Sequence, residues 1–240
     1  MMRSPDEADS LASRGGNVAV RERPWDFPCY STAEFKADRL VHVLGIFAAA
    51  IAIPCLLIRL DPAAPARQIA AVWGYGASLL FMLCASAAYN MAKPGPWKAL
   101  LRRIDHAMIF LMIAGSYMPF ALCALPPRLG LPLTGIICAL ATIGVAMKLL
   151  CRKDHDRIFL ILYLSMGWMV LGVIRPLLEA LPVTPGVFLI AGAVIYSLGT
   201  CAHISTRIPF QNVIWHSMVL VGAALHLIAI YQFIPAAVRS

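Results

Sequence analysis

Charged residues are scarce in this chain. They make up 13% of its 240 residues, about half the share found in typical soluble domains. Hydrophobic residues make up 60%, the mean hydropathy is +0.77, and the apolar residues form runs of roughly membrane-spanning length. This composition excludes an ordinary soluble domain and predicts a polytopic membrane protein.

Several familiar site patterns are also missing. The seven cysteines contain no CxxC pair and no zinc-ribbon spacing, so we interpret them as packing residues rather than a disulfide framework. The sequence has no glycine-rich phosphate loop, no GxSxG and no HExxH. The net charge of +8 comes from basic residues in loops between apolar runs, which indicates membrane topology and no nucleic-acid partner.

The apolar runs predict an all-α bundle of seven transmembrane helices. The expected spans are residues 40–60, 69–90, 104–125, 129–150, 158–178, 183–203 and 213–234. We expect a flexible cytoplasmic tail at 1–30, one membrane domain at 31–236 and a short outer tail at 237–240. Residues 31–40 resemble an amphipathic lead-in to the first span. The first 30 residues lack the apolar core of a signal peptide.

Most of the 20 Lys and Arg residues fall on one side of the predicted membrane. The positive-inside rule then predicts a cytoplasmic N-terminus and an outer C-terminus. Short loops and the lack of a signal peptide favour the bacterial plasma (inner) membrane. With this orientation, the polar ends of four spans share the cytoplasmic side.

Ionisable residues in a membrane segment are costly and mark candidate functional sites. The most informative pair is Asp105–His106, at the start of the third span. The other polar residues expected at that depth, several of them spaced by four along a helix, are Glu34, Asp38, His42, Ser86, Asn90, Gln211, Asn212 and His216.

These residues predict a polar, partly hydrated cavity between the helices that opens toward the cytoplasm. The alternative is four separate interfacial patches whose side chains reach water. His226 lies about 15 Å deeper than His216 along the same helix, so we expect it to form hydrogen bonds between helices. For His155 and His203 we expect interfacial positions, and the sequence assigns no further role to any of these three histidines.

The order of these motifs resembles the hemolysin III family, which is related to the progestin and adipoQ receptors. The resemblance runs through residues 33–232. It is strongest in LRRIDHAMIFLMIAGSYMPF at 101–120 and in QNVIWHSMVLVGAALHLIAI at 211–230. The segment SAAYN at 86–90 resembles the family's Ser-x-x-x-His motif, and residues 34–42 resemble its N-terminal Glu/His signature.

The resemblance implies a zinc site held by three histidines, with an aspartate that holds the zinc-bound water. At the corresponding positions this chain has Asn90, Asn212, His216 and Asp105, with Ser86 beside them. Only one of the three histidines is present. Because a neutral amide oxygen is a weaker zinc donor than imidazole, three alternatives are open: a retained but different site, a site that has lost its function, and a zinc site rescued by His42 or His106.

Three functions follow from these alternatives. The first is a divergent site that binds a lipid or small ligand. The second is a zinc-dependent hydrolase of lipid amides or esters, with Asp105 acting on water and Ser86 positioning the oxyanion. The third is the pore-forming activity in the family's name, which ranks last because the spans carry no continuous polar stripe. Membrane lipids are the expected partners, and the oligomeric state is not fixed by the sequence.

Overall fold

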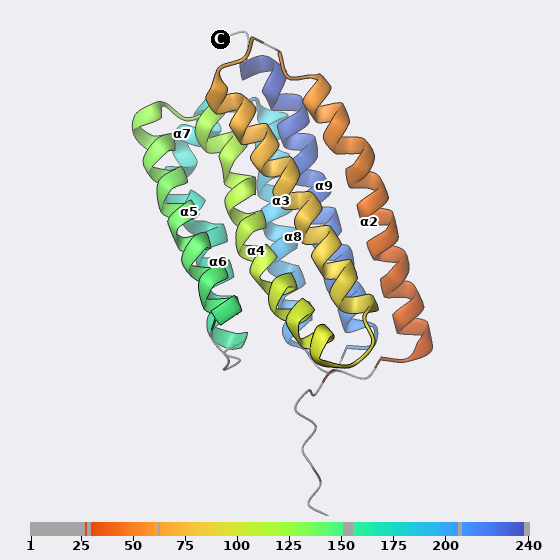
Figure 1. Cartoon of the computed structure of the whole chain (residues 1–240). Coiled ribbons are helices and arrows are strands. Elements are labelled where there is room, and N and C mark those ends of the chain that lie inside the picture. The colour runs from red at the N-terminus through yellow and green to blue at the C-terminus, as the bar shows by residue number, and fades with distance from the viewer. Residues whose placement is uncertain (1–26, 28–29, 62, 151–155, 206–207, 238–240) are drawn as a thin grey trace, which may run out of the picture.

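The computed structural model describes residues 27, 30–61, 63–150, 156–205 and 208–237. Nearly all of the expected N-terminal tail and residues 238–240 of the expected outer tail lie outside the described residues. Seven helical segments are long and apolar enough to cross a membrane, which confirms the predicted seven-helix architecture (Figure 1). The elements are α2 (Thr32–Ile58), α3 (Ala66–Met91), α4 (Pro96–Cys123), α5 (Pro127–Leu150), α6 (Asp156–Trp168), η1 (Met169–Val173), α7 (Ile174–Ala180), α8 (Val183–Ile204) and α9 (Gln211–Ala237).

The first span starts earlier than its apolar run. Residues 31–40, expected as an amphipathic lead-in, form the N-cap and first turns of α2. Ser31 and Glu34 make a capping box: the Ser31 hydroxyl accepts from the Glu34 backbone N–H, and the Glu34 carboxylate accepts from the Ser31 backbone N–H. Because the helix is already formed here, Asp38 and His42 lie on one rigid face, one turn apart.

The fifth span is interrupted near its middle. The α-helix α6 ends at Trp168, a 3₁₀ turn (η1) follows, and α7 completes the span. The Tyr117 hydroxyl of α4 lies 2.8 Å from the Met166 carbonyl oxygen, 2.9 Å from the Gly167 carbonyl oxygen and 2.8 Å from the Val170 backbone N–H. This hydroxyl therefore satisfies backbone groups that a regular helix would pair internally.

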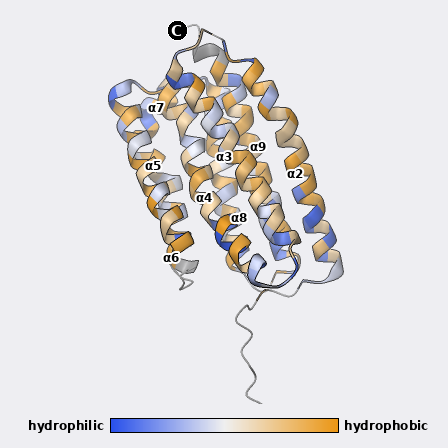
Figure 2. Cartoon of the chain, in the orientation of Figure 1, coloured by the Kyte–Doolittle hydropathy of each residue, from blue (hydrophilic) through white to orange (hydrophobic). Residues whose placement is uncertain are grey.

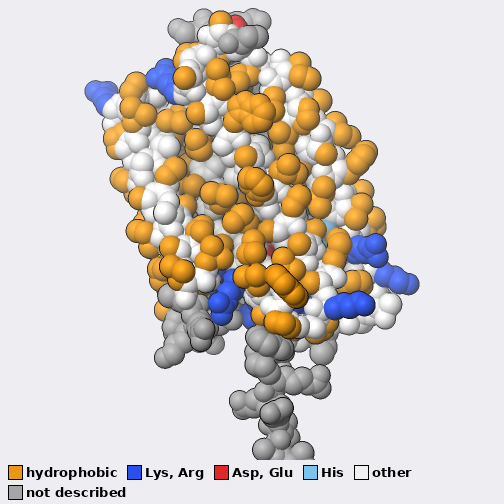
Figure 3. Space-filling view, in the orientation of Figure 1, with side chains coloured by type: hydrophobic (Ala, Val, Ile, Leu, Met, Phe, Trp, Pro, Cys, Tyr) orange, Lys and Arg blue, Asp and Glu red, His pale blue; other side chains and the backbone are white. Residues whose placement is uncertain are grey.

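The helices pack around a core formed mainly by α3, α4 and α9. α3 packs most extensively on α4, and α8 on α9, while α2 lies against α3 and α9 (Figure 1). The fully buried side chains include Tyr75, Leu56, Ile230 and Phe110. The helices are mostly apolar along their length (Figure 2), and exposed apolar side chains are spread over the face shown in Figure 3, as expected for lipid-facing helices.

One end of the bundle carries the site. α2, α4 and α9 begin at this end and α3 finishes there, at the bottom of Figure 1. We call it the polar end, defined by Asp38, His42, Asn90, Asp105 and His216. The arrangement brings four helix termini together at one level, which is the convergence that the sequence predicts.

Candidate functional site

Asp38 is the centre of the polar cluster. Its side chain is buried, and its Oδ1 lies 2.6 Å from Nδ1 of His216 on α9. Its Oδ2 accepts a hydrogen bond from the Asn212 amide at 3.2 Å. The same oxygen lies 3.4 Å from Nε2 of His42, one turn further along α2. One carboxylate thus joins the start of α2 to the start of α9.

The two histidines of the cluster face each other. The rings of His42 and His216 are tilted by 54°, with their centroids 4.5 Å apart. The His42 ring is only 3% exposed. Its Nε2 contacts Asp38 without hydrogen-bond geometry and has no hydrogen-bond partner among the described residues. This buried ring nitrogen therefore lies 3.4 Å from the Asp38 carboxylate without forming a hydrogen bond.

The two asparagines join α3 to this cluster. Asn212 donates from Nδ2 to Oδ1 of Asn90 at 3.2 Å, and the same nitrogen lies 3.5 Å from Nδ1 of His216. Asn90 in turn donates to the Ser86 carbonyl oxygen at 2.9 Å. The side chains of α2, α3 and α9 thus form one connected polar network.

Asp105 lies beside this network on α4. Its side chain is buried and interacts with the Ser86 side chain of α3. The Asp105, Ser86 and His216 side chains all line the same cavity. Asp105 is therefore a neighbour of the cluster centred on Asp38.

The remaining predicted site residues have different surroundings. Glu34 belongs to the capping box and accepts a hydrogen bond from the Phe210 backbone N–H at 3.0 Å. It lines a small crevice of about 10 Å³ together with Asp38, outside the main cavity. His106 lines the main cavity, and its carbonyl oxygen accepts from the Tyr163 hydroxyl at 2.8 Å. The position of His155 lies outside the described residues.

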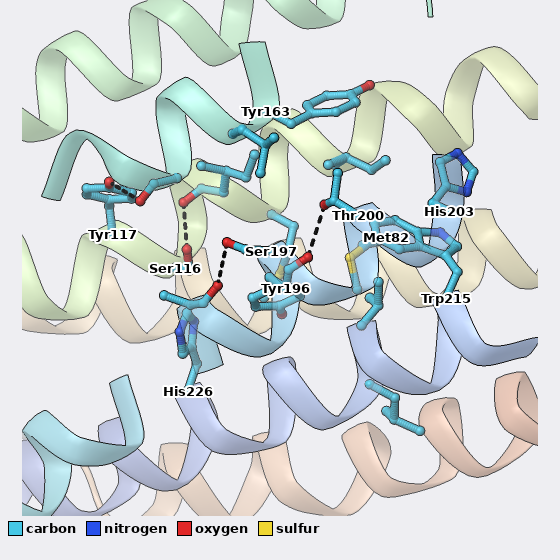
Figure 4. Close-up of a pocket in the computed structure, with 18 of the residues that line it drawn as sticks. Met82, Ser116, Tyr117, Tyr163, Tyr196, Ser197, Thr200, His203, Trp215 and His226 are labelled. Atoms are coloured by element: carbon cyan, nitrogen blue, oxygen red, sulfur yellow. Dashed lines mark hydrogen bonds between the residues drawn. The ribbon is translucent and has the colours of Figure 1, made fainter. Parts of the chain in front are cut away.

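A cavity of about 420 Å³ extends from the polar end into the bundle. His42, Asn90, Asp105 and His216 line it at the polar end, and His226 lies at its deep end, about 15 Å further along α9 by helical rise. The rest of the lining is mainly apolar and comes from α3, α4, α6, η1, α7, α8 and α9, with the Ser197 and Thr200 side chains of α8 among it. Figure 4 shows Ser116, Tyr117, Ser197 and His226 around the deep part.

Two polar atoms at the deep end lack hydrogen-bond partners within the part of the chain that the structure describes. They are the Tyr196 hydroxyl and Nδ1 of His226, while Nε2 of His226 lies 3.2 Å from the Leu189 carbonyl oxygen. The two rings meet edge to face at 5.4 Å (Figure 4). The hydrogen-bonding role expected for His226 is therefore filled at one of its two nitrogens.

Sequence reasoning did not identify Tyr117, Tyr196 or Trp168 as site residues. Trp168 donates to the Ser197 hydroxyl at 3.1 Å and so joins the end of α6 to α8 beside the cavity. A single aromatic residue in an apolar span is normally interpreted as a packing residue, and no sequence spacing indicates where its polar atom lies. Only the helix arrangement reveals these three side chains at the cavity.

The positions that the resemblance assigns to zinc do not suit that metal. The Asn90 oxygen accepts from Asn212, and the Asn212 amide donates to both Asn90 and Asp38. These amides bind each other and present N–H groups where a metal needs lone pairs. Another set does offer strong donors within a small volume: the ligand atoms of Asp38, His42 and His216 all lie within 4.8 Å of one another.

Comparison with known proteins gives consistent relatives. The family model for "Haemolysin-III related" proteins matches residues 37–227. The "Hemolysin-3 homolog" of Bacillus subtilis (strain 168) is 32% identical over 195 residues, 81% of this chain and 92% of that protein. "Hemolysin-3" of Bacillus cereus is 31% identical over 189 residues, 79% of this chain and 86% of that protein.

A mammalian protein also matches. The "Monocyte to macrophage differentiation factor" of Homo sapiens is 29% identical over 172 residues, 68% of this chain and 69% of that protein. No solved structure matches the chain. The family match covers most of the seven-helix domain, including Asp38, His42, Asp105 and His216. The chain therefore belongs to the hemolysin III family.

Proposed function

We propose that this protein binds a membrane amphiphile, with the polar group of the ligand at the polar end and its apolar part in the cavity. The observation that carries the proposal is the cavity of about 420 Å³, which has charged and amide side chains at the polar end and a mainly apolar lining beyond them. Its volume falls within the range of roughly 300–1,000 Å³ that is typical of small-molecule sites. A polar head would meet Asn90, Asp105 and His216.

The exposure of several cavity-lining residues supports entry of a ligand from the lipid. Three cavity-lining residues are also exposed on the outer surface: Leu171 of η1, Trp168 of α6 and Ile190 of α8. They border the place where the fifth span is interrupted and packs loosely on α8. An apolar ligand could enter there from the membrane without crossing water.

The unpaired polar atoms of the deep end add to this argument. Leaving a buried donor or acceptor without a partner costs about 1–3 kcal/mol. The two unpaired atoms, the Tyr196 hydroxyl and Nδ1 of His226, belong to residues that line the cavity. A ligand with a second polar group, or water carried with it, would satisfy them.

A second candidate is the metal-dependent hydrolysis of lipid amides or esters. It is favoured by the position of Asp105 and Ser86 beside His216, at the polar end of a cavity that suits a lipid. In that reaction Asp105 would accept a proton from water and Ser86 would position the substrate. Pore formation ranks below both, because the carboxylate and amide side chains that line the cavity lie at the polar end, and the Ser197 and Thr200 hydroxyls further along it donate to carbonyl oxygens of their own helix. The bacterial plasma membrane is the location we propose.

Two tryptophan substitutions on α8 test amphiphile binding. Ala193 lines the cavity, whereas the adjacent Val194 is exposed on the lipid side. We expect native mass spectrometry of the protein in mild detergent to show a bound amphiphile for wild type and for Val194→Trp, and its loss in Ala193→Trp. Equal occupancy in both variants, or no bound amphiphile in the wild type, would contradict the proposal.

A further inference from the structure

We propose that Asp38, His42 and His216 form a binding site for a divalent transition-metal ion, built on α2 and α9. The site shares only His216 with the positions that the family resemblance assigns to zinc. The inference does not depend on the amphiphile, since these three side chains are in place without one. It differs from every zinc arrangement that sequence reasoning considered, because Asp38 supplies the carboxylate.

The donor atoms already lie at nearly the separations that a metal requires. Ligand atoms of a tetrahedral zinc site lie about 2.0–2.2 Å from the ion, and hence roughly 3.3 Å from one another. Here the Asp38 oxygens lie 2.6 Å from His216 Nδ1 and 3.4 Å from His42 Nε2, and all three ligand atoms fall within 4.8 Å. Small side-chain rotations would bring the three donors around one ion.

The free nitrogen of His42 is an independent observation that points to a ligand. This ring is 3% exposed, and its Nε2 has no hydrogen-bond partner in the described portion of the chain. It faces Asp38 and the His216 ring. A buried imidazole nitrogen that makes no hydrogen bond is costly, and a metal ion in the cluster would use its lone pair.

The chemistry of the donors selects the class of ion. Two imidazoles and one carboxylate form a donor set used by catalytic zinc and by non-haem iron, whereas magnesium and calcium prefer oxygen ligands alone. Asp38 would also reduce the net charge of a divalent ion. Asn212 would support the carboxylate from the outer side, because it donates to Asp38 Oδ2 at 3.2 Å.

The ion would lie at the wall of the large cavity. His42 and His216 line the cavity, while Asp38 lines only the small crevice behind it. The three protein ligands would therefore lie along one wall of the cavity, and the coordination position that faces the cavity would stay open for a further ligand. A closed structural zinc site has four protein ligands, so this arrangement is the open kind.

Cobalt titration tests the site with the metal alone. The detergent-purified protein, stripped with chelator, is titrated with Co²⁺, and the visible absorption and bound metal per chain are measured. We expect one Co²⁺ per chain in the wild type, displaced by Zn²⁺. We expect the signal to be lost in Asp38→Asn and in His42→Gln, and kept in the control His203→Gln, which removes a histidine on α8.

A sulfur substitution separates loss of a ligand from loss of the fold. His42→Cys, purified as folded and monodisperse protein, should retain one cobalt per chain and add a thiolate-to-cobalt charge-transfer band that wild type and His42→Gln lack, which would show that position 42 supplies a ligand. Cobalt binding that survives both Asp38→Asn and His42→Gln would overturn the proposal, as would no binding by wild type. Loss in Asp105→Asn with retention in Asp38→Asn would place the ion on α4 and overturn it too. Since no lipid is added, these outcomes are separate from those of the amphiphile experiment.

Discussion

The network around Asp38 explains how a carboxylate is tolerated inside a membrane helix. A charged group there is costly unless it faces the bundle and is paired. Asp38 is 7% exposed and contacts Asn212, His42 and His216. Each neighbour is a hydrogen-bond donor or a group that can carry positive charge. The residue thus satisfies the physical conditions for burial and ties α2 to α9.

The two asparagines allow the original family geometry to be tested directly. Asn212 Nδ2 lies 3.2 Å from Asn90 Oδ1 and 3.5 Å from His216 Nδ1, so imidazoles at 90 and 212 would converge on His216. We expect Asn90→His with Asn212→His to bind Zn²⁺ more tightly than wild type, by roughly tenfold or more, because the family's three positions would then add two imidazoles beside His216 and the Asp38 cluster. Competition with a chromogenic chelator would measure the affinity.

The control for this double variant adds Asp38→Asn to it. If the restored histidines form their own site, zinc binding should persist without the Asp38 carboxylate. An unchanged affinity in the double variant would mean that α3 and α9 do not approach at this level as the structure shows.

At the scale of elements, the interruption of the fifth span depends on one hydroxyl from another helix. Tyr117 is 8% exposed and bonds to three backbone groups of residues 166–170. We expect Tyr117→Phe to reduce the free energy of unfolding by about 1–3 kcal/mol, because buried backbone groups lose their partner. Backbone hydrogen exchange should also accelerate at residues 166–170.

Tyr231→Phe is the matched control. Tyr231 is 36% exposed on α9 and faces Arg59 through its ring, which phenylalanine retains. A thermal midpoint in detergent and exchange rates equal to those of wild type are expected for this variant. Equal stability of Tyr117→Phe and the control would show that the 3₁₀ turn does not need the hydroxyl.

The seven membrane spans could be predicted because each apolar run in the sequence is long enough for a helix to cross the membrane. The predicted spans 40–60 and 104–125 begin eight residues after α2 and α4 do, respectively. Polar residues extend the first turns of these helices, and hydropathy counts such residues as loop. The break at η1 was missed because MVLGV is apolar like its surroundings, and its cause lies in α4. Only contacts between elements could reveal it.

The packing partners of small residues also could not be predicted from the sequence. Gly192 and Gly199 suggest close helix packing, and the structure places that packing inside the chain, between α8 and α9. A Cβ on Gly192 would lie 2.3 Å from a ring carbon of His226. The glycine therefore makes room for the histidine at the deep end of the cavity. Sequence spacing alone does not say which helix faces a glycine.

At the scale of the whole molecule, the depth of the site residues along their helices could be predicted from the sequence. The contacts between these residues could be predicted less well. Depth along each span follows from counting residues, so Asp38, His42, Asn90, Asn212 and His216 could all be predicted at one end. Which carboxylate meets His216 depends on how each helix is rotated about its axis. Sequence reasoning gave the central place to Asp105, and the structure gives it to Asp38.

The position of the polar end relative to the membrane is the last property that the charge pattern predicts. Basic residues cluster at that end. Among them are Lys93, between α3 and α4, and Lys98, Arg102 and Arg103, in the first turns of α4. The positive-inside rule then predicts a cytoplasmic polar end and, with seven spans, termini on opposite sides of the membrane. The cavity would therefore receive polar groups from the cytoplasmic leaflet.

Reporter fusions at the two ends of the chain test this orientation in a bacterial host. We expect green fluorescent protein to fluoresce at the N-terminus and alkaline phosphatase to be active only at the C-terminus, because each reporter works on one side of the inner membrane. Replacing Lys93, Lys98, Arg102 and Arg103 with glutamine should weaken the bias and lower phosphatase activity at the C-terminus. Active phosphatase at the N-terminus of the unaltered chain would reverse the topology and turn the Asp38 cluster toward the outer leaflet.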